Sequence, residues 1–279
     1  MEVKTNKKLS SVESELEVIS NAVLSASHFY VSEVKINTLG EWPRLVKNTS
    51  NPDIMRNILY YGFQPLYDSL VDDPCSGDLR IHALSALEGV VSISRDYLVT
   101  YYKGNPDTDK VRQQVGNLRE HFSEMESLYC NKKFRNIDFN HIYSPDIQLF
   151  LIQFLEHVRI KKIDFPDYIV GCACGSSEIA MTLAGLLDIN IGFIRRSFRR
   201  GDKSPLIIEE QKEKIGQSVK DKRVVCIEDY VCTGESLKKV MEKVGSFGAE
   251  DVKGTCINYS HQGYPLKIIV DNENFRYFG

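Results

Sequence analysis

An acidic pair in the second half of the chain, Glu228 and Asp229, directly follows the apolar run VVCI and precedes the loop YVCTGES and a helix-like stretch. Backbone N–H groups and the dipole at a helix N-terminus attract an anion. The two carboxylates can accept hydrogen bonds from sugar hydroxyls. A strand, turn and helix in this order predict a site that binds a phosphate and a ribose side by side. The alternative is an ordinary strand–turn–helix whose acids face solvent.

The stretch from Val224 to Ser236 closely resembles the PRPP-binding signature of type I phosphoribosyltransferases, in which apolar residues, an acidic pair and a few variable residues precede Thr-Gly-x-Ser/Thr. The resemblance covers roughly the C-terminal half of the chain. It implies that Glu228 and Asp229 are catalytic and bind the ribose 2′- and 3′-hydroxyls of PRPP. It also implies a loop around the 5′-phosphate, formed by Val231, Cys232, Thr233, Gly234, Glu235 and Ser236.

A second apolar run, loop and helix-like stretch lies upstream, with the sequences YIVG, CACGSS and EIAMTLAGLL. This loop lacks the Gly-Lys-Ser/Thr ending of a nucleoside-triphosphatase P-loop, which excludes that class of site. It looks like the family's pyrophosphate loop, where small residues present N–H groups to the diphosphate. The resemblance assigns this role to Cys172, Ala173, Cys174 and Gly175.

A basic segment follows the next apolar run, IGFI. The spacing of Arg195, Arg196 and Arg199 is similar to that of orotate-type members of the family, and together with Lys203 these residues are expected to bind the pyrophosphate. Arginine forks suit bidentate contact with phosphate. The alternatives are a solvated surface loop and a nucleic-acid patch, and the neighbouring motifs favour diphosphate binding.

The resemblance implies displacement of pyrophosphate from C1 of PRPP by a nitrogen acceptor, which is expected to be a nucleobase. Mg²⁺ is expected to bind through PRPP rather than in a protein cage, so no protein metal ligands are expected. Cys232 stands where the hypoxanthine-guanine branch carries an aspartate, which disfavours a 6-oxopurine acceptor. The acceptor pocket is expected from the helix before the first strand or from residues 265–278, whose aromatic side chains either stack on a base or fill the core.

Composition narrows the class of protein. The net charge of -3 argues against a dedicated nucleic-acid binder without forbidding a local basic patch. The sequence has no signal-peptide pattern and no stretch of transmembrane length. Seven cysteines with no paired knuckles indicate reduced packing thiols in a cytoplasmic protein, with metal binding or redox sensing as the minor alternatives.

The fold class predicted for residues 136–279 is α/β, a mostly parallel sheet flanked by helices with its site at the carboxyl ends of the strands. Strands are expected near residues 167–171, 190–195, 223–228 and 252–258, with a further pair near the end. Residues 1–135 are predicted to form an all-helical domain. Its apolar stripes, clearest from Asp107 to Tyr129, are typical of a bundle core or of a seam that binds a partner.

The sequence leaves two functions open. The first is an active phosphoribosyltransferase, plausibly a homodimer as family members often are. The second is a PRPP- or nucleotide-binding regulator or effector, of defence or toxin type, whose helical half binds a protein partner.

Overall fold

A computed structural model describes most of the chain, which divides into two compact units. One unit comprises Met1–Leu24 with Ile142–Gly279, and the other Ser25–His141. The predicted domain boundary between residues 135 and 136 lies outside the described residues. The described residues are 2–22, 42–72, 77–129, 144–173, 175–197, 201–231, 234–259 and 270–271.

A five-stranded sheet forms the centre of the first unit, in the order β2-β1-β3-β4-β5. The first four strands in this order are parallel, and β5 pairs antiparallel with β4. This confirms the predicted fold class. The strands are β1 (Tyr168–Cys172), β2 (Asn190–Ile194), β3 (Arg223–Val231), β4 (Asp251–Tyr259) and β5 (Val270–Asp271).

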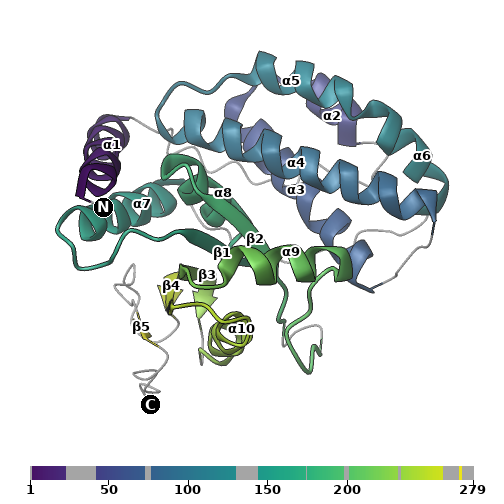
Figure 1. The fold of residues 1–279 in the computed structure, drawn as a ribbon. Helices are drawn as coiled ribbons and strands as arrows, with labels where there is room; N and C mark the ends of the chain where they lie inside the picture. Colours follow the sequence, from purple (N-terminus) through teal and green to yellow (C-terminus); the bar gives the residue numbers. More distant parts are fainter. Residues whose placement is uncertain are drawn as a thin grey trace. The chain divides into compact units, whose positions relative to one another are not determined.

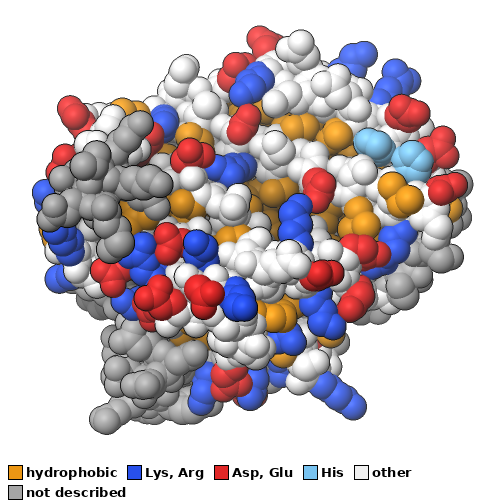
Figure 2. All heavy atoms as spheres, in the orientation of Figure 1, with side chains coloured by type: hydrophobic (Ala, Val, Ile, Leu, Met, Phe, Trp, Pro, Cys, Tyr) orange, Lys and Arg blue, Asp and Glu red, His pale blue; other side chains and the backbone are white. Residues whose placement is uncertain are grey.

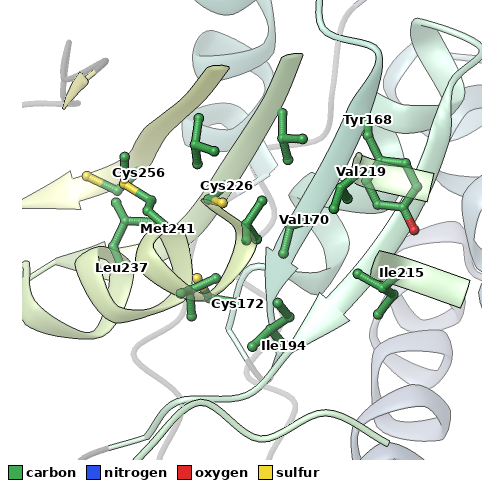
Figure 3. Close-up of a cluster of buried hydrophobic side chains, with 14 of the residues drawn as sticks. Tyr168, Val170, Cys172, Ile194, Ile215, Val219, Cys226, Leu237, Met241 and Cys256 are labelled. Atoms are coloured by element: carbon green, nitrogen blue, oxygen red, sulfur yellow. The ribbon is translucent and has the colours of Figure 1, made fainter. Parts of the chain in front are cut away.

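Helices cover both faces of this sheet (Figure 1). On one face, α9 (Glu209–Val219) and α10 (Glu235–Gly245) contribute side chains to a buried cluster with β1, β3 and β4. On the other face lies α8 (Ser177–Leu186), since a Cβ added to Gly171 of β1 would meet Ala180 of α8. Figure 3 shows the first cluster, in which the sulfur atoms of Cys172, Cys226 and Cys256 lie among aliphatic side chains.

Two further helices complete this unit, α1 (Glu2–Asn21) and α7 (Ser144–Arg159). The Gln148 side-chain amide of α7 donates to the carbonyl oxygens of Ile19 at 2.9 Å and Ala22 at 2.8 Å, and so joins the two helices. The sequence analysis grouped residues 1–24 with the helical half, whereas in the structure they belong to the unit that contains the sheet.

The second unit is helical, as the sequence predicts for this part of the chain. Asn51 caps the helix α3 (Pro52–Asp72), since its Oδ1 accepts from the backbone N–H of Asp53 at 2.9 Å and of Ile54 at 3.1 Å. Asp107 caps another in the same way, by accepting from the Lys110 N–H at 2.9 Å. The helices are α2 (Trp42–Lys47), α3 (Pro52–Asp72), α4 (Asp78–Tyr102), α5 (Thr108–Asn117) and α6 (Arg119–Tyr129).

The stretch from Asp107 to Tyr129, expected as one helix, is divided into α5 and α6 at Leu118. Gly116 and Asn117 are weak helix formers. The Leu118 side chain lies so close to Gly89 of α4 that an added Cβ there would be 2.5 Å from its Cδ2. The break therefore has a local cause, in the propensity of two residues, and a tertiary one, in the contact with α4.

Trp42, the first residue of α2, is a packing anchor of the second unit. Its side chain is 0 % exposed, its Nε1 donates to the Ile58 carbonyl oxygen at 2.6 Å, and its ring stacks on Phe122 at 5.0 Å between centroids. Gly62 of α3 leaves the space for the indole, since an added Cβ would overlap it.

Trp42→Ala is expected to lower the free energy of unfolding of the helical unit by about 3–5 kcal/mol, because it leaves a cavity and removes the donor to the Ile58 carbonyl. Urea unfolding followed by circular dichroism measures this. Ile81→Ala removes a side chain that is 62 % exposed on α4 and is the control, expected within about 0.5 kcal/mol of wild type. Equal unfolding midpoints for the two variants would contradict the anchor role of Trp42.

Two histidines, His82 of α4 and His121 of α6, lie side by side, with 3.0 Å between their Nδ1 atoms. Figure 2 shows histidine side chains in pale blue at the surface. The contact joins two helices of the second unit, which is a structural role.

None of the helices in the described ranges is long and apolar enough to cross a membrane.

Candidate active site

The carboxyl ends of β1 and β3 meet at the point where the winding of the sheet reverses. From β1 the chain passes through α8 to β2 on one side, and from β2 it passes through α9 to β3 on the other side. Open α/β sheets bind ligands in the crevice at such a switch point. The loop after β1 and the acidic pair of β3 both lie there.

The acidic pair lies inside β3, which continues three residues beyond the predicted end at 228. Pairing with β1 ends at Ile227↔Gly171, whereas pairing with β4 continues to Val231↔Tyr259. The prediction ended the strand too early because the apolar run stops at Ile227, and hydrogen bonds with β4 extend it. Glu228 and Asp229 therefore lie in the part of β3 that pairs with β4 but no longer with β1, next to the end of β1.

The backbone of Gly175 packs directly against the carboxylate of Asp229. A Cβ added to Gly175 would overlap all three carboxylate atoms of Asp229. Gly175 lies just before α8, so the Asp229 carboxylate is placed at the start of that helix. Gly175 is predicted for the pyrophosphate loop and Asp229 for the ribose. Position 175 therefore needs glycine, because a larger residue would collide with Asp229.

Glu228 lies on the other face of the sheet, because successive side chains alternate along a strand. One neighbour is the Cys172 thiol, which shares a hydrogen bond with its carboxyl group. The Oε2 atom of Glu228 is buried and has no hydrogen-bond partner in the described structure. A buried acceptor without a partner is costly, and a ligand hydroxyl can supply the missing donor.

Burial raises the pKa of Glu228 well above its usual range, and the negative charge of Asp229 raises it further. Burial also raises the pKa of the neighbouring Cys172 thiol, and Glu228 adds to this effect. For Cys256, which pairs with Glu228 in the sheet, burial and then the two carboxylates raise the pKa to about 12. These thiols are protonated packing residues, as the number and spacing of the cysteines indicated, because deprotonation would bury a negative charge beside the acids.

This raised pKa predicts how stability depends on pH. Between the pKa of an unfolded glutamate, about 4.3, and the raised pKa of Glu228, the folded chain binds more protons than the unfolded chain. The free energy of unfolding contributed by this group therefore falls as pH rises through that window. Glu228→Gln removes the effect and is expected to become progressively more stable than wild type with rising pH, as measured by urea unfolding across a pH series. Glu213→Gln, on the exposed surface of α9, is the control, and a difference that does not change with pH would contradict the prediction.

The predicted 5′-phosphate loop joins β3 to α10. Gly234 has a φ of 76°, in the left-handed region that favours glycine, and its carbonyl oxygen accepts the Lys238 N–H at 2.9 Å. Val231 is buried at the end of β3, and Glu235 and Ser236 form the first turn of α10. Cys232 and Thr233 lie outside the described residues. The N-terminus of α10 thus opens at the same edge of the sheet as the acidic pair.

The predicted pyrophosphate loop is held by two hydrogen bonds at its base. The N–H of Ala173 donates to the Ile194 carbonyl oxygen at 2.9 Å, and the Ser176 hydroxyl donates to the Cys172 carbonyl oxygen at 2.8 Å. Cys174 lies outside the described residues. Ser176 was not among the predicted site residues, although it stands in the quoted loop CACGSS.

The basic residues after β2 are placed differently from one another. Arg195 is 1 % exposed and forms an ion pair with Asp202, Arg196 is 8 % exposed, and Lys203 is at the surface. Arg199 lies outside the described residues. The residues 265–278 expected at the acceptor pocket also lie outside them, except for 270–271. Asp202 is a residue that the sequence reasoning missed. The sequence does carry a signal for it, because Asp202 is the only acidic residue between Arg195 and Lys203, a segment with five cations.

Residues in the C-terminal half are similar to known phosphoribosyltransferases. Residues 152–275 match the family model for the phosphoribosyl transferase domain. A curated orotate phosphoribosyltransferase of Carboxydothermus hydrogenoformans is 29% identical over 161 residues, which are 53% of this chain and 76% of that protein. The crystal structure of a purine phosphoribosyltransferase from Pyrococcus horikoshii Ot3 aligns with a TM-score of 0.33 and 24% identity, over 45% of this chain and 94% of that one. The predicted resemblance is therefore confirmed: within the C-terminal half, residues 152–275 match the phosphoribosyl transferase domain.

Proposed function

We propose that the protein transfers the phosphoribosyl group of PRPP to a nitrogen acceptor, which we expect to be a nucleobase. The observation that carries this proposal is the acidic pair at the switch point of the sheet. Asp229 lies against the Gly175 backbone, and Glu228 has a buried Oε2 without a partner. Asp229 lies beside the loop that leads into α8, and the pair precedes the loop that leads into α10. A ribose that carries one phosphate group and one diphosphate group matches this arrangement of acceptors and anion sites.

In the proposed reaction a nitrogen lone pair forms the bond to C1 of the ribose. The bond from C1 to the diphosphate oxygen breaks, and pyrophosphate leaves with the electron pair. Positive charge develops on the ribosyl group in the transition state, so the protein has to place that group and exclude water. Glu228 and Asp229 accept from the 2′- and 3′-hydroxyls. The backbone of residues 172–175 and the N-terminus of α8 bind the diphosphate, and the loop before α10 binds the 5′-phosphate.

Mg²⁺ fits this site as a partner of the substrate. Mg²⁺ usually keeps several waters and binds through substrate phosphates, so Glu228 and Asp229 would meet it through PRPP and water rather than as direct ligands. When bound with PRPP, the ion would neutralise charge on the diphosphate. The two residues would then orient the ribose together with its ion.

The experiment is pyrophosphate release from Mg-PRPP over a panel of purines, pyrimidines and small amines. Orotate comes first because the similar protein from C. hydrogenoformans is an orotate phosphoribosyltransferase. Release that depends on the acceptor and is lost in Glu228→Gln/Asp229→Asn supports the transferase and identifies the acceptor class. Tight PRPP binding without release for any acceptor would instead support the regulator or effector, with the helical unit as its partner-binding part. Failure to bind either PRPP or a nucleotide would contradict both.

The assembly of the protein is also a proposal. We expect a homodimer, and a protein partner for the helical half if the chain is a regulator. Sedimentation of the full chain with and without Mg-PRPP tests the first expectation.

A further inference from the structure

Residues 195–197 and 201–206, which follow β2, form two arms that lie against each other. Arg195 and Leu206 pair as an antiparallel bridge, with N–O distances of 2.9 and 2.7 Å. Closer to the tip, the Asp202 N–H donates to the Ser197 carbonyl oxygen at 3.1 Å, and Oδ2 of Asp202 accepts from the Ser197 N–H at 2.9 Å. Asp202 therefore holds the two arms of this segment together through both its backbone and its side chain.

The same carboxylate binds the guanidinium of Arg195. Nε of Arg195 lies 3.3 Å from Oδ2 of Asp202, and Nη2 lies 3.4 Å from Oδ1. Both side chains are buried, with 2% and 6% of their surface exposed. A buried charge needs its partner, because desolvation without compensation is strongly unfavourable. The geometry thus makes Arg195 an internal part of the folded segment.

From these contacts we propose that Arg195 and Asp202 are positioning residues, which fix the basic segment beside the pyrophosphate loop, and that Arg195 does not itself bind the diphosphate. This rests on the proposed function. Their sequence neighbours Arg196 and Lys203 are then the cations of the described segment that are placed for the diphosphate. The position is suitable, because Ile194, directly before Arg195, accepts a hydrogen bond from Ala173 of the pyrophosphate loop.

The rival assignment, in which Arg195 is a diphosphate ligand and Asp202 merely restrains it, makes the opposite prediction. Removing the Asp202 charge would then release Arg195 and tighten PRPP binding. If Arg195 only braces the segment, removing that charge leaves a buried cation without its partner and disturbs the segment. PRPP binding then weakens.

The first variant is Asp202→Asn, which keeps the shape and an oxygen for the Ser197 N–H but loses the charge. We expect the Kd for Mg-PRPP, measured by titration calorimetry, to rise at least tenfold. The kcat at saturating PRPP is expected to change less than threefold, because the bound substrate still meets the acidic pair. A lower Kd than that of wild type would overturn the proposal.

The matched control is Asp167→Asn. Asp167 makes a similar bidentate pair with Arg223, with distances of 3.0 Å from Nε to Oδ2 and 3.2 Å from Nη2 to Oδ1. That pair lies at the opposite end of the strands, where β3 begins. Its Kd for Mg-PRPP is expected to stay within threefold of wild type. An equal loss in both variants would mean that any broken ion pair has this effect, and would overturn the specific role of Asp202.

The second variant, Arg195→Met/Asp202→Asn, removes both buried charges together and keeps an oxygen that accepts from the Ser197 N–H. If the pair only positions the segment, the double variant binds Mg-PRPP within about threefold of wild type, whereas Arg195→Met alone binds at least tenfold more weakly. A double variant as weak as Arg195→Met alone would assign Arg195 to the diphosphate and overturn the proposal.

Amide hydrogen exchange separates this proposal from the proposed function. Asp202→Asn is expected to speed exchange at the Leu206 N–H, and Arg195→Met/Asp202→Asn to restore its protection, whether or not the wild type binds PRPP. If the wild type binds no PRPP while this pattern holds, the proposed transferase function is contradicted, but the positioning role of Arg195 and Asp202 is supported. An unchanged exchange rate of the Leu206 N–H in Asp202→Asn would overturn this positioning role.

Discussion

Glu228→Gln/Asp229→Asn is expected to reduce kcat/KM for PRPP by about 10³-fold or more, since loss of a single charge-stabilising contact typically costs 10²–10³-fold. Each substitution keeps the shape of the side chain but places an N–H₂ group where a carboxylate oxygen accepts. The chain is expected to stay folded, because Glu228 is a buried acid whose pKa burial raises, and a neutral amide is easier to bury. Coupled pyrophosphate detection measures the rate, and urea unfolding checks the fold.

The single variants sharpen this prediction. Glu228 and Asp229 lie on opposite faces of β3, one beside Cys172 and the other against Gly175. If both hold the same ribose, either substitution alone causes most of the loss, and the combined effect is far from additive. Undiminished turnover in the double variant would contradict the role of the pair. Fully additive single losses would mean that the two carboxylates act on separate groups.

The acidic pair and its strand could be predicted because the features that define them are contiguous in sequence. Apolar residues, two acids, a turn with Gly234 and a helix follow one another within β3 and α10, so local propensity and the tertiary structure agree. The four parallel strands lie within a few residues of their predicted ranges for the same reason. The end of β3 was missed because hydrogen bonds to β4, rather than hydrophobic pattern, carry the strand past Ile227.

Features that depend on distant contacts could not be predicted in the same way. The ion pair of Arg195 and Asp202 requires the segment to reverse, and a run of cations gives no register for that reversal. The association of α1 with α7 rests on Gln148, more than a hundred residues away from its acceptors. The residue-by-residue roles assigned to the phosphate and pyrophosphate loops remain predictions, and Cys174, Arg199, Cys232 and Thr233 lie outside the described residues.

Gly175→Ala is the smallest change expected to disable the site, with PRPP affinity lowered about 10²-fold. The new methyl group would overlap the Asp229 carboxylate. The backbone at residue 175 is held by the loop base and by α8, so the carboxylate has to move. A displacement of about 1 Å at a reacting centre can cost 10²-fold. Because the displaced group is the end of a side chain, the free energy of unfolding is expected to change little. Titration calorimetry with Mg-PRPP and urea unfolding measure the two quantities.

Gly116→Ala is the matched control for this substitution. No atom lies within 4 Å of the added Cβ at Gly116 of α5, and alanine is expected to stabilise that helix by about 0.5–1 kcal/mol without changing PRPP affinity. A double-mutant cycle tests the route of the effect. On an Asp229→Ala background there is no carboxylate to displace, so adding Gly175→Ala is expected to cost less than threefold more affinity. A full further 10²-fold loss there would mean that the methyl group blocks the diphosphate itself, and that the contact between Gly175 and Asp229 does not set the position of the acidic pair.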